Sequence, residues 1–392
     1  MSELSYLEKL MDGVEVEWKS LGDVVNFQRG RRLVKSQLET RGKYAVYQNS
    51  MTPLGYYHEY NVAAQSSFII CAGAAGEIGY SENEFWAADD VHFAITPEYI
   101  NDRFLFHFLL TQKNKISGQV RRASIPRLSK SVIEKLEFPI PCPDNPEKSL
   151  AIQSEIVRIL DKFTALTAEL TAELTAELNM RKKQYNYYRD QLLSFKDGEV
   201  EWKTLGEVAQ YSKTRISFEL LDERNYVGVD NLLQNRAGKS LSNHVPTSGK
   251  LTEFIPNDIL IGNIRPYLKK IWQADCIGGT NGDVLVIRCI DSSINTRYLY
   301  QILADDKFFE YNMQHAKGAK MPRGSKEDIM KYPIPVPPLT LQARIVEILN
   351  KFDTLTNSIT EGLPREIELR QKQYEYYRDL LFSFPKPETA SN

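Results

Sequence analysis

Residues 181–195 read RKKQYNYYRDQLLSF, and residues 370–384 read RQKQYEYYRDLLFSF, with eleven of the fifteen positions identical. Upstream of each copy, IQSEIVRILDKFTALT at 152–167 matches LQARIVEILNKFDTLT at 341–356 at the same spacing of 189 residues. Because the spacing is constant, the two segments align without a gap. A chain that repeats so long a segment is expected to contain two copies of one structural unit.

Two shorter matches extend the repeat: EVEWKSLGDV at 15–24 returns as EVEWKTLGEV at 199–208, and FPIPCP at 138–143 returns as YPIPVP at 332–337. Each copy therefore has a variable block, a short proline-rich segment (138–143 or 332–337, called here the gate) and a conserved segment. A chain of 392 residues is also too long for one ordinary core. The expected divisions are a first variable domain at 1–149, a conserved helix at 150–196, a second variable domain at 197–338, a second conserved helix at 339–384 and a flexible tail at 385–392.

The N-terminus resembles the tip of the repeated segment, since YLEKLMDGVEVEW before residue 19 is similar to DQLLSFKDGEVEW before residue 203. One interpretation places residues 1–14 beside the C-terminal helix, where they would close the two copies into a pseudo-twofold ring. The alternative is a short N-terminal helix with no closing role.

The conserved segments are predicted to be long helices that pair with each other. In the first segment, apolar residues recur every three or four positions from Ile152 to Leu178, and proline and glycine are absent from 151–197. A long helix with one apolar stripe needs a partner, and the second segment offers one of equal length, as an antiparallel coiled coil. Gly362 and Pro364 interrupt that second segment, so a kink or restart is expected at Pro364.

Thr167–Leu178 consists of three TAEL tetrapeptides. The simplest interpretation is a helix-forming linker. The repeat is also interpreted as a ruler, because one added or removed tetrapeptide moves the ends of a helix by about 6 Å and about 40° relative to each other.

The variable blocks are predicted to be mixed α/β domains. Short apolar runs bounded by glycine and asparagine, SSFIICAG at 66–73 and NDILIGNI at 257–264, are typical of buried strands. INDRFLFHFLL at 100–110 and INTRYLYQILA at 294–304 predict amphipathic helices at matching places. The predicted fold class is therefore α/β (α+β), with two domains joined by two long helices in an antiparallel coiled coil and an internal pseudo-twofold repeat.

The net charge of −2 excludes a polycation, so any nucleic-acid surface has to be local. Basic residues do gather locally: VRRASIPRLSK at 120–130 and KGAKMPRGSK at 317–326 contain no acid. Lys and Arg bind phosphates, whereas Asn, Gln and Arg read base edges. A single basic cluster is often only a solvated surface, but here two clusters occupy matching places. The candidate DNA-binding residues are Arg29, Arg31, Arg32, Lys35, Gln48, Asn49, Arg121, Arg122, Arg127, Lys130, Asn231, Asn235, Arg265, Tyr267, Lys269, Lys317, Lys320, Arg323, Ser325 and Lys326.

The sequence offers no support for catalysis by this chain. It contains no phosphate-binding glycine-rich loop of the P-loop type and no Asn/Asp-Pro-Pro-aromatic motif of base methylation. The five histidines are dispersed, and the four cysteines lack the spacing of a zinc or redox site. No apolar run approaches the roughly 20 residues of a membrane span, and residues 1–13 lack the apolar core of a signal peptide. A reduced, cytoplasmic setting is expected.

The repeated EVEW-Lys-Ser/Thr-Leu-Gly segments, the PIP gates, the paired helical segments, the KQY-x-YYRD ends and the TAEL run together resemble the specificity subunit of a type I restriction-modification system, most closely the type IC branch. The resemblance covers essentially the whole chain and is weaker in the variable blocks. It implies two target recognition domains that each read one half of an asymmetric bipartite DNA site, with a coiled coil that sets the spacer.

The resemblance also implies partners and cofactors. Two modification subunits would bind S-adenosylmethionine and methylate adenine at N6, and restriction subunits would use ATP and Mg to translocate and cut DNA, so this chain would hold no cofactor. The repeated helix ends are expected to meet equivalent partner surfaces, since they are rich in residues that anchor interfaces. The alternative is that they only pack the ends of the coiled coil. The residues concerned are Tyr185, Tyr187, Tyr188, Arg189, Tyr374, Tyr376, Tyr377 and Arg378.

A second hypothesis of a different class remains, namely a non-catalytic coiled-coil scaffold that displays two ligand-binding domains. It predicts no steep salt dependence of binding to duplex DNA, whereas contacts to phosphates require one.

Overall fold

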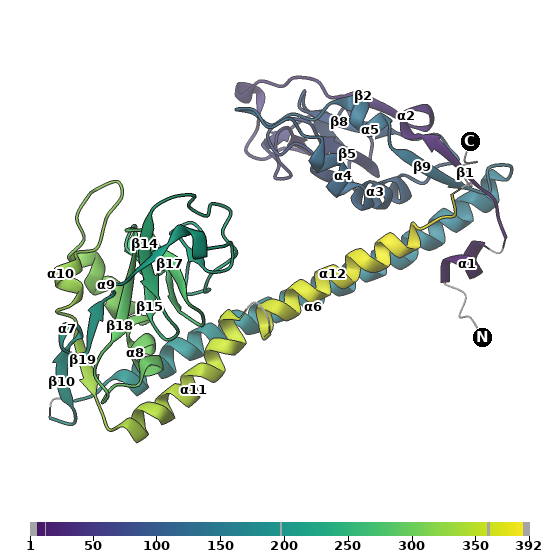
Figure 1. Ribbon diagram of the computed structural model, residues 1–392. Helices are drawn as coiled ribbons and strands as arrows, with labels where there is room; N and C mark the ends of the chain where they lie inside the picture. The colour runs from purple at the N-terminus through teal and green to yellow at the C-terminus, as the bar shows by residue number, and fades with distance from the viewer. Residues whose placement is uncertain (1–5, 12, 197, 359–360, 387–392) are drawn as a thin grey trace. The chain divides into compact units, whose positions relative to one another are not determined.

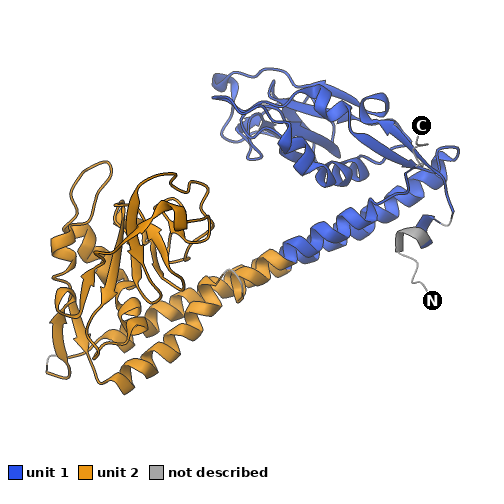
Figure 2. Ribbon diagram, in the orientation of Figure 1, with its two compact units in different colours: residues 1–169, 370–392 blue, residues 170–369 orange. Residues whose placement is uncertain are grey.

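The computed structural model describes residues 6–11, 13–196, 198–358 and 361–386. The chain forms two compact units (Figure 2), one of residues 1–169 with 370–392 and one of residues 170–369. They are called here the first and the second unit. Their boundary on the first long helix falls between Glu169 and Leu170, inside the TAEL run. Each unit therefore holds one variable block together with parts of both conserved segments.

The first unit is a mixed α/β domain with the ends of two long helices (Figure 1). Its elements are α1 (Tyr6–Met11), β1 (Val16–Ser20), α2 (Leu21–Val24), β2 (Asn26–Arg29), the 3-10 helix η1 (Lys35–Gln37), β3 (Tyr44–Tyr47), β4 (Gly55–Tyr57), β5 (Ser66–Ile70), β6 (Ile78–Ser81), β7 (Phe85–Ala87), β8 (Val91–Ile95), α3 (Asp102–Thr111), α4 (Lys113–Gly118), α5 (Lys130–Glu134), β9 (Glu137–Pro141), the first half of α6 (Pro146–Leu193) and the end of α12 (Leu363–Leu381).

The second unit contains the rest of α6, the second variable block and the remaining helices. Its elements are β10 (Glu201–Thr204), α7 (Leu205–Val208), β11 (Ala209–Tyr211), β12 (Arg215–Ser217), η2 (Phe218–Leu220), β13 (Tyr226–Val227), β14 (Lys250–Phe254), β15 (Ile259–Gly262), η3 (Pro266–Leu268), β16 (Ile271–Gln273), β17 (Gly278–Thr280), β18 (Val284–Cys289), α8 (Thr296–Leu303), α9 (Asp306–Gln314), α10 (Lys326–Ile329), β19 (Pro333–Val336), α11 (Leu339–Asn357) and the start of α12.

The two units share one sheet plan, so the repeat in sequence is also a repeat in structure. The antiparallel sheet β2-β8-β5-β6 of the first unit corresponds to β11-β18-β15-β16 of the second. Each unit has a second sheet with one parallel pair, β3 with β7 and β13 with β17. Each also has an isolated antiparallel pair, β1 with β9 and β10 with β19. The predicted fold class, two α/β domains on two long helices with an internal repeat, is confirmed.

The proline-rich gates are strands. FPIP forms most of β9 and PIPV forms β19, each paired antiparallel with the EVEW strand of its own copy. Proline has no N–H to donate and is therefore found on edge strands, and a two-stranded pair consists only of edges. A backbone bond from the leucine after the EVEW strand extends the pairing in both copies: Leu21 N donates to Leu136 O at 2.7 Å and Leu205 N to Tyr332 O at 2.8 Å, with the second gate shifted by two residues.

The long helices agree with the predicted periodicity in their main features. α6 is one continuous helix of 48 residues that contains the whole TAEL run; it begins at Pro146 and ends at Leu193, whereas the expected range was 150–196. The second segment is divided into α11 and α12, and the restart predicted at Pro364 is confirmed, since α12 begins one residue earlier. Gly362, just before α12, has a left-handed φ of +81°, which glycine adopts without steric cost.

Aromatic contacts define the antiparallel pairing within each unit. In the first unit, the ring of Phe163 in α6 stacks on the ring of Tyr377 in α12, with ring centroids 5.4 Å apart. Thr164 Oγ1 lies 3.0 Å from Tyr374 Oη. In the second unit, Tyr185 and Tyr188 of α6 stack on one ring of α11, Phe352, at 5.8 and 5.4 Å.

The ends of both long helices complete the cores of the domains on which they finish. Leu381, Phe382 and Phe384 are buried in the core cluster of the first unit, which also contains Phe104 and Phe138. The equivalent residues of α6 and the turn after it pack on the core of the second unit; these are Leu192, Leu193 and Phe195. The helix ends therefore belong to the domains as much as to the coiled coil.

Described residues near both ends of the chain have contacts in the first unit. Met11 is buried in the same cluster as Leu381, which agrees with packing of the N-terminal segment beside the C-terminal helix; residues 1–5 and 12 lie outside the described residues. Trp18 Nε1 donates to Pro385 O at 2.9 Å, and Lys386 pairs with Glu137 at 2.7 Å. Residues 385 and 386 therefore have contacts with the first unit, the flexible tail from residue 385 stays a prediction, and residues 387–392 lie outside the described residues.

In each copy, a buried glutamine of the long helix segment accepts an equivalent hydrogen bond from the recognition domain. Gln153 Oε1 accepts from Asn101 N at 2.8 Å, and Gln342 Oε1 accepts from Asn295 N at 2.8 Å. Both glutamines are fully buried, and both asparagines cap the helix that follows, α3 or α8. The attachment of the two domains to their helices is thus repeated at the level of single hydrogen bonds.

Six residues after these asparagines, on α3 and α8, the two attachments differ. In the first unit, buried His107 has Nε2 at 2.8 Å from Asp161 Oδ1, the oxygen to which Arg103 Nε donates at 3.0 Å. In the second unit the equivalent residue is buried Gln301, whose Oε1 accepts from Tyr185 Oη at 3.0 Å. The first attachment therefore contains a histidine where the second contains a glutamine.

We predict that the first unit loses stability below about pH 6.5 because of His107. Burial lowers the pKa of His107, and the Asp161 carboxylate only partly opposes this, while Arg103 and Arg378 add to it. The unfolded chain has the ordinary pKa of about 6.5 and takes up the proton first, so stability is complete above that value and is lost as the pH falls toward the lower folded pKa.

The measurement is the urea midpoint of the full chain at pH 7.5 and pH 5.5, for the wild type and for His107→Gln. Gln is the residue at the equivalent position of the second unit and keeps a donor for Asp161. Burial raises the pKa of Asp102 to about 6, which has the opposite pH trend, but this group is present in both variants and cancels in the difference. Equal pH dependence of the two variants would refute the assignment to His107.

Candidate nucleic-acid interface

The basic segment after β2 in the first unit is held close to the β7–β8 connection. Gly30 N donates to Val91 O and Arg31 N to Ala87 O, both at 2.9 Å. Arg29 Nε donates to Asp89 O at 2.6 Å. The predicted binding residues Arg29, Arg31, Arg32 and Lys35 are all exposed along this segment. The backbone is thus anchored while the cationic side chains face solvent.

A second basic turn of the first unit lies beside the end of β5. Arg121 and Arg127 form a backbone bridge with each other, and Gly73 N donates to Pro126 O at 3.1 Å. Ala74 N donates to Asn49 O at 2.9 Å, which brings the candidate base reader Asn49 to the same place. The exposed side chains gathered here are Asn49, Arg121, Arg122 and Arg127, with half-buried Gln48 next to them in the chain.

The second unit builds the same turn from its own residues. Lys317 and Arg323 form the equivalent backbone bridge, and Arg265 N donates to Pro322 O at 2.7 Å. Asn235 N donates to Leu268 O at 2.9 Å, which adds a third loop. Candidates more than 50 residues apart in sequence, such as Arg265 and Arg323, are therefore neighbours in the fold. The exposed ones among them are Asn235, Arg265, Tyr267, Lys317, Lys320, Arg323 and Lys326.

One candidate base reader is wrong. Asn231 is buried, its Oδ1 accepts from Gly228 N at 2.7 Å, and its Nδ2 donates to Tyr226 O and Ser240 O at 3.1 and 3.0 Å. All its polar atoms are used to hold a turn, so it has none left for a base edge.

Other candidates have structural partners that reduce their availability, among them Arg323, which pairs with Asp283 at 2.7 Å. Lys130 pairs with Glu134 at 2.9 Å, and Lys269 donates to Asp306 at 2.7 Å. The Ser325 hydroxyl accepts from Asp328 N at 3.3 Å and caps α10. Their contact with DNA stays a prediction, and for Lys269 such contact requires exchange of an existing ion pair.

The repeated helix ends divide into buried and exposed positions. Tyr185 and Arg189 are only 3% and 2% exposed, and the Arg189 guanidinium lies 4.1 Å from the Tyr185 ring centroid. Their assignment to a partner interface is therefore wrong, because both side chains are inside the second unit. Tyr187 and Tyr376, which are equivalent, are 61% and 63% exposed.

The exposed tyrosine pairs of the two units have the same geometry. The rings of Tyr187 and Tyr188 are 5.5 Å apart at 73°, and those of Tyr376 and Tyr377 are 5.4 Å apart at 69°. Tyr188 is exposed, whereas Tyr374, Tyr377 and Arg378 are half-buried. Each unit thus presents the same edge-to-face pair to the outside, and these pairs are called here the tyrosine patches.

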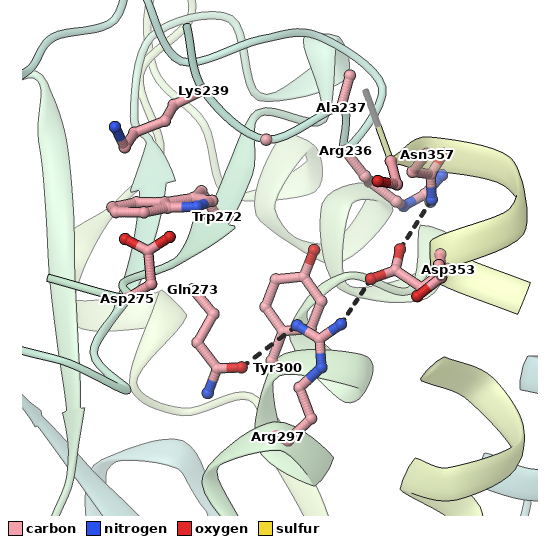
Figure 3. A pocket seen from close by; sticks show the side chains of 13 residues that line it. Arg236, Ala237, Lys239, Trp272, Gln273, Asp275, Arg297, Tyr300, Asp353 and Asn357 are labelled. Carbon is pink, nitrogen blue, oxygen red and sulfur yellow. Dashed lines mark hydrogen bonds and ion pairs between the residues drawn. The ribbon is translucent and has the colours of Figure 1, made fainter. Parts of the chain in front are cut away.

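Figure 3 shows a polar pocket of about 410 Å³ in the second unit, between the recognition domain and α11. Lys239 Nζ lies 5.1 Å from the Trp272 ring centroid on one side. On the other, Arg297 pairs with Asp353 at 2.5 Å and donates to Gln273 Oε1 at 3.3 Å. Because Arg297 is already paired, it joins α8 to α11 rather than facing the pocket with a free charge.

Sequence reasoning missed the role of Arg297. The signal was present, since INDR at 100–103 and INTR at 294–297 place an arginine at matching positions. In the first unit, the equivalent Arg103 pairs with Asp161 of α6 at 3.0 Å. A repeated arginine on the buried side of an amphipathic helix therefore indicated an attachment to the long helices.

A cysteine–histidine pair lies in the first unit but lacks the electrostatics of an activated nucleophile. Cys71 Sγ is 2.6 Å from His92 Nδ1. Burial raises the pKa of the Cys71 thiol to about 12, and burial together with the Arg29 charge lowers the pKa of His92. The thiolate, which is the reactive form, is therefore disfavoured at neutral pH. The expectation from sequence of a non-catalytic chain stays a prediction.

Among the described residues, no group of three or more histidine, cysteine, aspartate or glutamate side chains is arranged to hold a metal ion. In the described ranges, no helix is both long enough and apolar enough to cross a membrane.

The chain contains two copies of one α/β domain. Each copy has an exposed basic turn at the same place, and each is attached to the same long helix. This arrangement defines a binding protein with two equivalent binding domains. The family model of the type I restriction modification DNA specificity domain matches residues 13–180 and again 198–369. The chain belongs to this family, and the resemblance seen in the repeated motifs is confirmed.

Relatives extend over the whole chain. It is 42% identical over 415 residues to the EcoR124I/EcoR124II type I restriction enzyme specificity subunit of Escherichia coli, with all of both chains covered. It is 35% identical over 408 residues to the putative type I restriction enzyme specificity subunit S.HindORF215P of Haemophilus influenzae, covering 97% of this chain and 98% of that one. A solved chain from a study of complex assembly and conformational transition of the type I R-M system shares the fold, with a TM-score of 0.58 at 16% identity over 94% and 97% of the two chains.

Proposed function

We propose that this chain is the DNA sequence-specificity subunit of a type I restriction-modification complex and that each recognition domain reads one half of an asymmetric bipartite site. One observation carries the proposal: the same exposed basic turn is built by the same backbone bonds in both units, from different side chains. Equivalent turns suit the near-symmetric phosphate backbone, and different side chains suit two different half-sites.

The long helices then set the distance between the half-sites and bind two copies of one partner. The tyrosine patches support this, because exposed aromatic pairs of equal geometry offer equal anchors to two identical modification subunits. S-adenosylmethionine for adenine N6 methylation, and ATP and Mg for restriction, are assigned to the modification and restriction subunits. This chain contributes recognition only, in the cytoplasm.

The test is a methylome. The chain is expressed with a type IC modification subunit in a host that lacks adenine methylation, and N6-methyladenine is mapped by long-read sequencing. A single bipartite motif that requires this chain is the expected result. No new methylation from a soluble, associated complex would contradict the proposal.

The salt dependence of DNA binding distinguishes the proposed function from the scaffold hypothesis. DNA recognition through arginine turns predicts that the association constant of the complex for its duplex falls linearly with salt on logarithmic axes, because phosphate contacts release counterions. A flat salt dependence would favour the scaffold.

We predict that Tyr187→Ala and Tyr376→Ala each weaken the binding of one modification subunit by roughly tenfold, and that the double variant weakens the binding of both. Exposed tyrosines at interface centres contribute about 1–2 kcal/mol or more when truncated. The measurement is the stoichiometry and dissociation constant of the complex by native mass spectrometry and calorimetry.

The matched control is Leu220→Ala, since Leu220 is also highly exposed but lies in a recognition domain. It is expected to leave assembly unchanged. If the double tyrosine variant assembles as tightly as the control, the tyrosine patches are not the docking sites.

A further inference from the structure

We propose that Arg265 reads a guanine in the major groove of the half-site bound by the second recognition domain. The inference rests on the proposed function and adds a specificity-determining residue to it. Three loops of the second unit, residues 231–240, 263–270 and 317–326, carry the exposed basic side chains Arg265, Lys317, Lys320, Arg323 and Lys326.

The backbone of Arg265 is fixed where these three loops meet. Its N–H donates to Pro322 O at 2.7 Å, and its carbonyl accepts from Leu268 N at 2.9 Å. In the adjoining loop, Asn235 N donates to Leu268 O at 2.9 Å. A side chain that reads a base has to start from a rigid backbone, and position 265 provides one.

Arg265 occupies an unfavourable conformation. Its φ of 52° and ψ of 64° lie in the left-handed region, where the backbone of any residue other than glycine is strained. Pro266 follows, and the residue before a proline is ordinarily pushed toward extended conformations. Residues held in such regions persist where the surrounding structure enforces them, and they cluster at functional sites.

The first unit shows that the same turn can be made without this strain. There Gly73 has a φ of +78° and donates its N–H to Pro126 O at 3.1 Å, as Arg265 does to Pro322. Glycine adopts this conformation at no steric cost. The fold therefore does not require a side chain at this position, and the second unit has an arginine there despite the strain.

Among the arginines of the three loops, Arg265 differs from Arg236 and Arg323 because its side chain forms no ion pair with a described residue. Arg236 pairs with Asp306, and Arg323 pairs with Asp283 at 2.7 Å. The Arg265 side chain is exposed and has no ion pair within the part of the chain that the structure describes. A free guanidinium on a fixed backbone matches the O6 and N7 acceptors of guanine with two parallel hydrogen bonds, which is the commonest specific contact in the major groove.

The test combines the methylome with thermal unfolding for Arg265→Gly and Arg265→Gln, each in the complex with modification subunits. Both variants are expected to accept other bases at one guanine of the second half-site, with discrimination there reduced roughly 5- to 150-fold. The first half-site and the spacer stay unchanged. The melting temperature of Arg265→Gly is expected to equal or exceed that of the wild type, since glycine relaxes the backbone.

The control is Asn257→Gly, because Asn257 is an exposed residue of the same unit with a φ of 75° and lies outside the three loops. It is expected to keep the full motif. An unchanged motif in the Arg265 variants, a uniform loss of methylation without a degenerate position, or a lower melting temperature of Arg265→Gly would each overturn the inference. Absence of any motif from the wild-type complex would instead contradict the proposed function.

Discussion

Deletion of one TAEL tetrapeptide from Thr167–Leu178 is expected to bring the two half-sites about one to two base pairs closer while both keep their sequences. Four residues of helix correspond to about 6 Å and about 40°. A base-pair step in B-DNA is about 3.4 Å and about 36°. The boundary between the two units on α6 falls inside the TAEL run, so the deletion leaves the contacts of each recognition domain intact. In the methylome, the wild-type spacing is expected to lose methylation completely.

Insertion of one TAEL unit is the reciprocal variant and is expected to lengthen the spacer by the same amount. The control replaces residues 171–174 by another helix-forming tetrapeptide of equal length, which should leave the motif unchanged. Altered bases in either half-site, or an unaltered spacer after deletion, would show that the TAEL run is not a ruler.

Gly30→Ala is expected to abolish recognition of the first half-site and to lower the free energy of unfolding of the first unit by at least about 2–3 kcal/mol. A Cβ on Gly30 would lie 2.2 Å from Ala88 O and 2.3 Å from Ala87 O. Both contacts are with backbone atoms, so the loop has to move away from the β7–β8 connection. That movement breaks the bond from Arg31 N to Ala87 O and displaces the arginines on either side of Gly30.

The measurements are denaturant unfolding of the chain and the methylome of its complex, in which loss of one half-site removes all methylation. Gly118→Ala is the matched control in the same unit, because a Cβ there meets no atom within 4 Å. It is expected to retain wild-type stability and motif. A Gly30→Ala variant that methylates normally would show that the segment after β2 is not part of the recognition surface.

The repeat made most of the architecture predictable from sequence. Constant spacing of long segments indicated two units, and apolar periodicity indicated the long helices. Pro364 indicated the restart of the second helix because proline cannot continue the preceding helix. These signals are local or depend on self-similarity, which a single sequence contains.

The orientation of individual side chains was not predictable, because it depends on partners far away in the chain. Tyr185 and Arg189 face inward because the Tyr185 hydroxyl donates a hydrogen bond to Gln301. That residue lies more than 100 positions later in the chain. Asn231 resembled a base reader among polar neighbours, yet its amide fits the turn that begins at Gly228. The strained backbone of Arg265 likewise arises from its bond to Pro322.

The assignment of core residues to units has a consequence for biosynthesis. The first recognition domain is translated first, yet its core is closed by Leu381, Phe382 and Phe384 at the far end of the chain. At about 5–20 residues per second, a ribosome needs roughly 10–40 s more to supply them after the TAEL run. The second recognition domain is complete earlier. An interrupted translation product that lacks these residues would therefore carry an unfinished first domain.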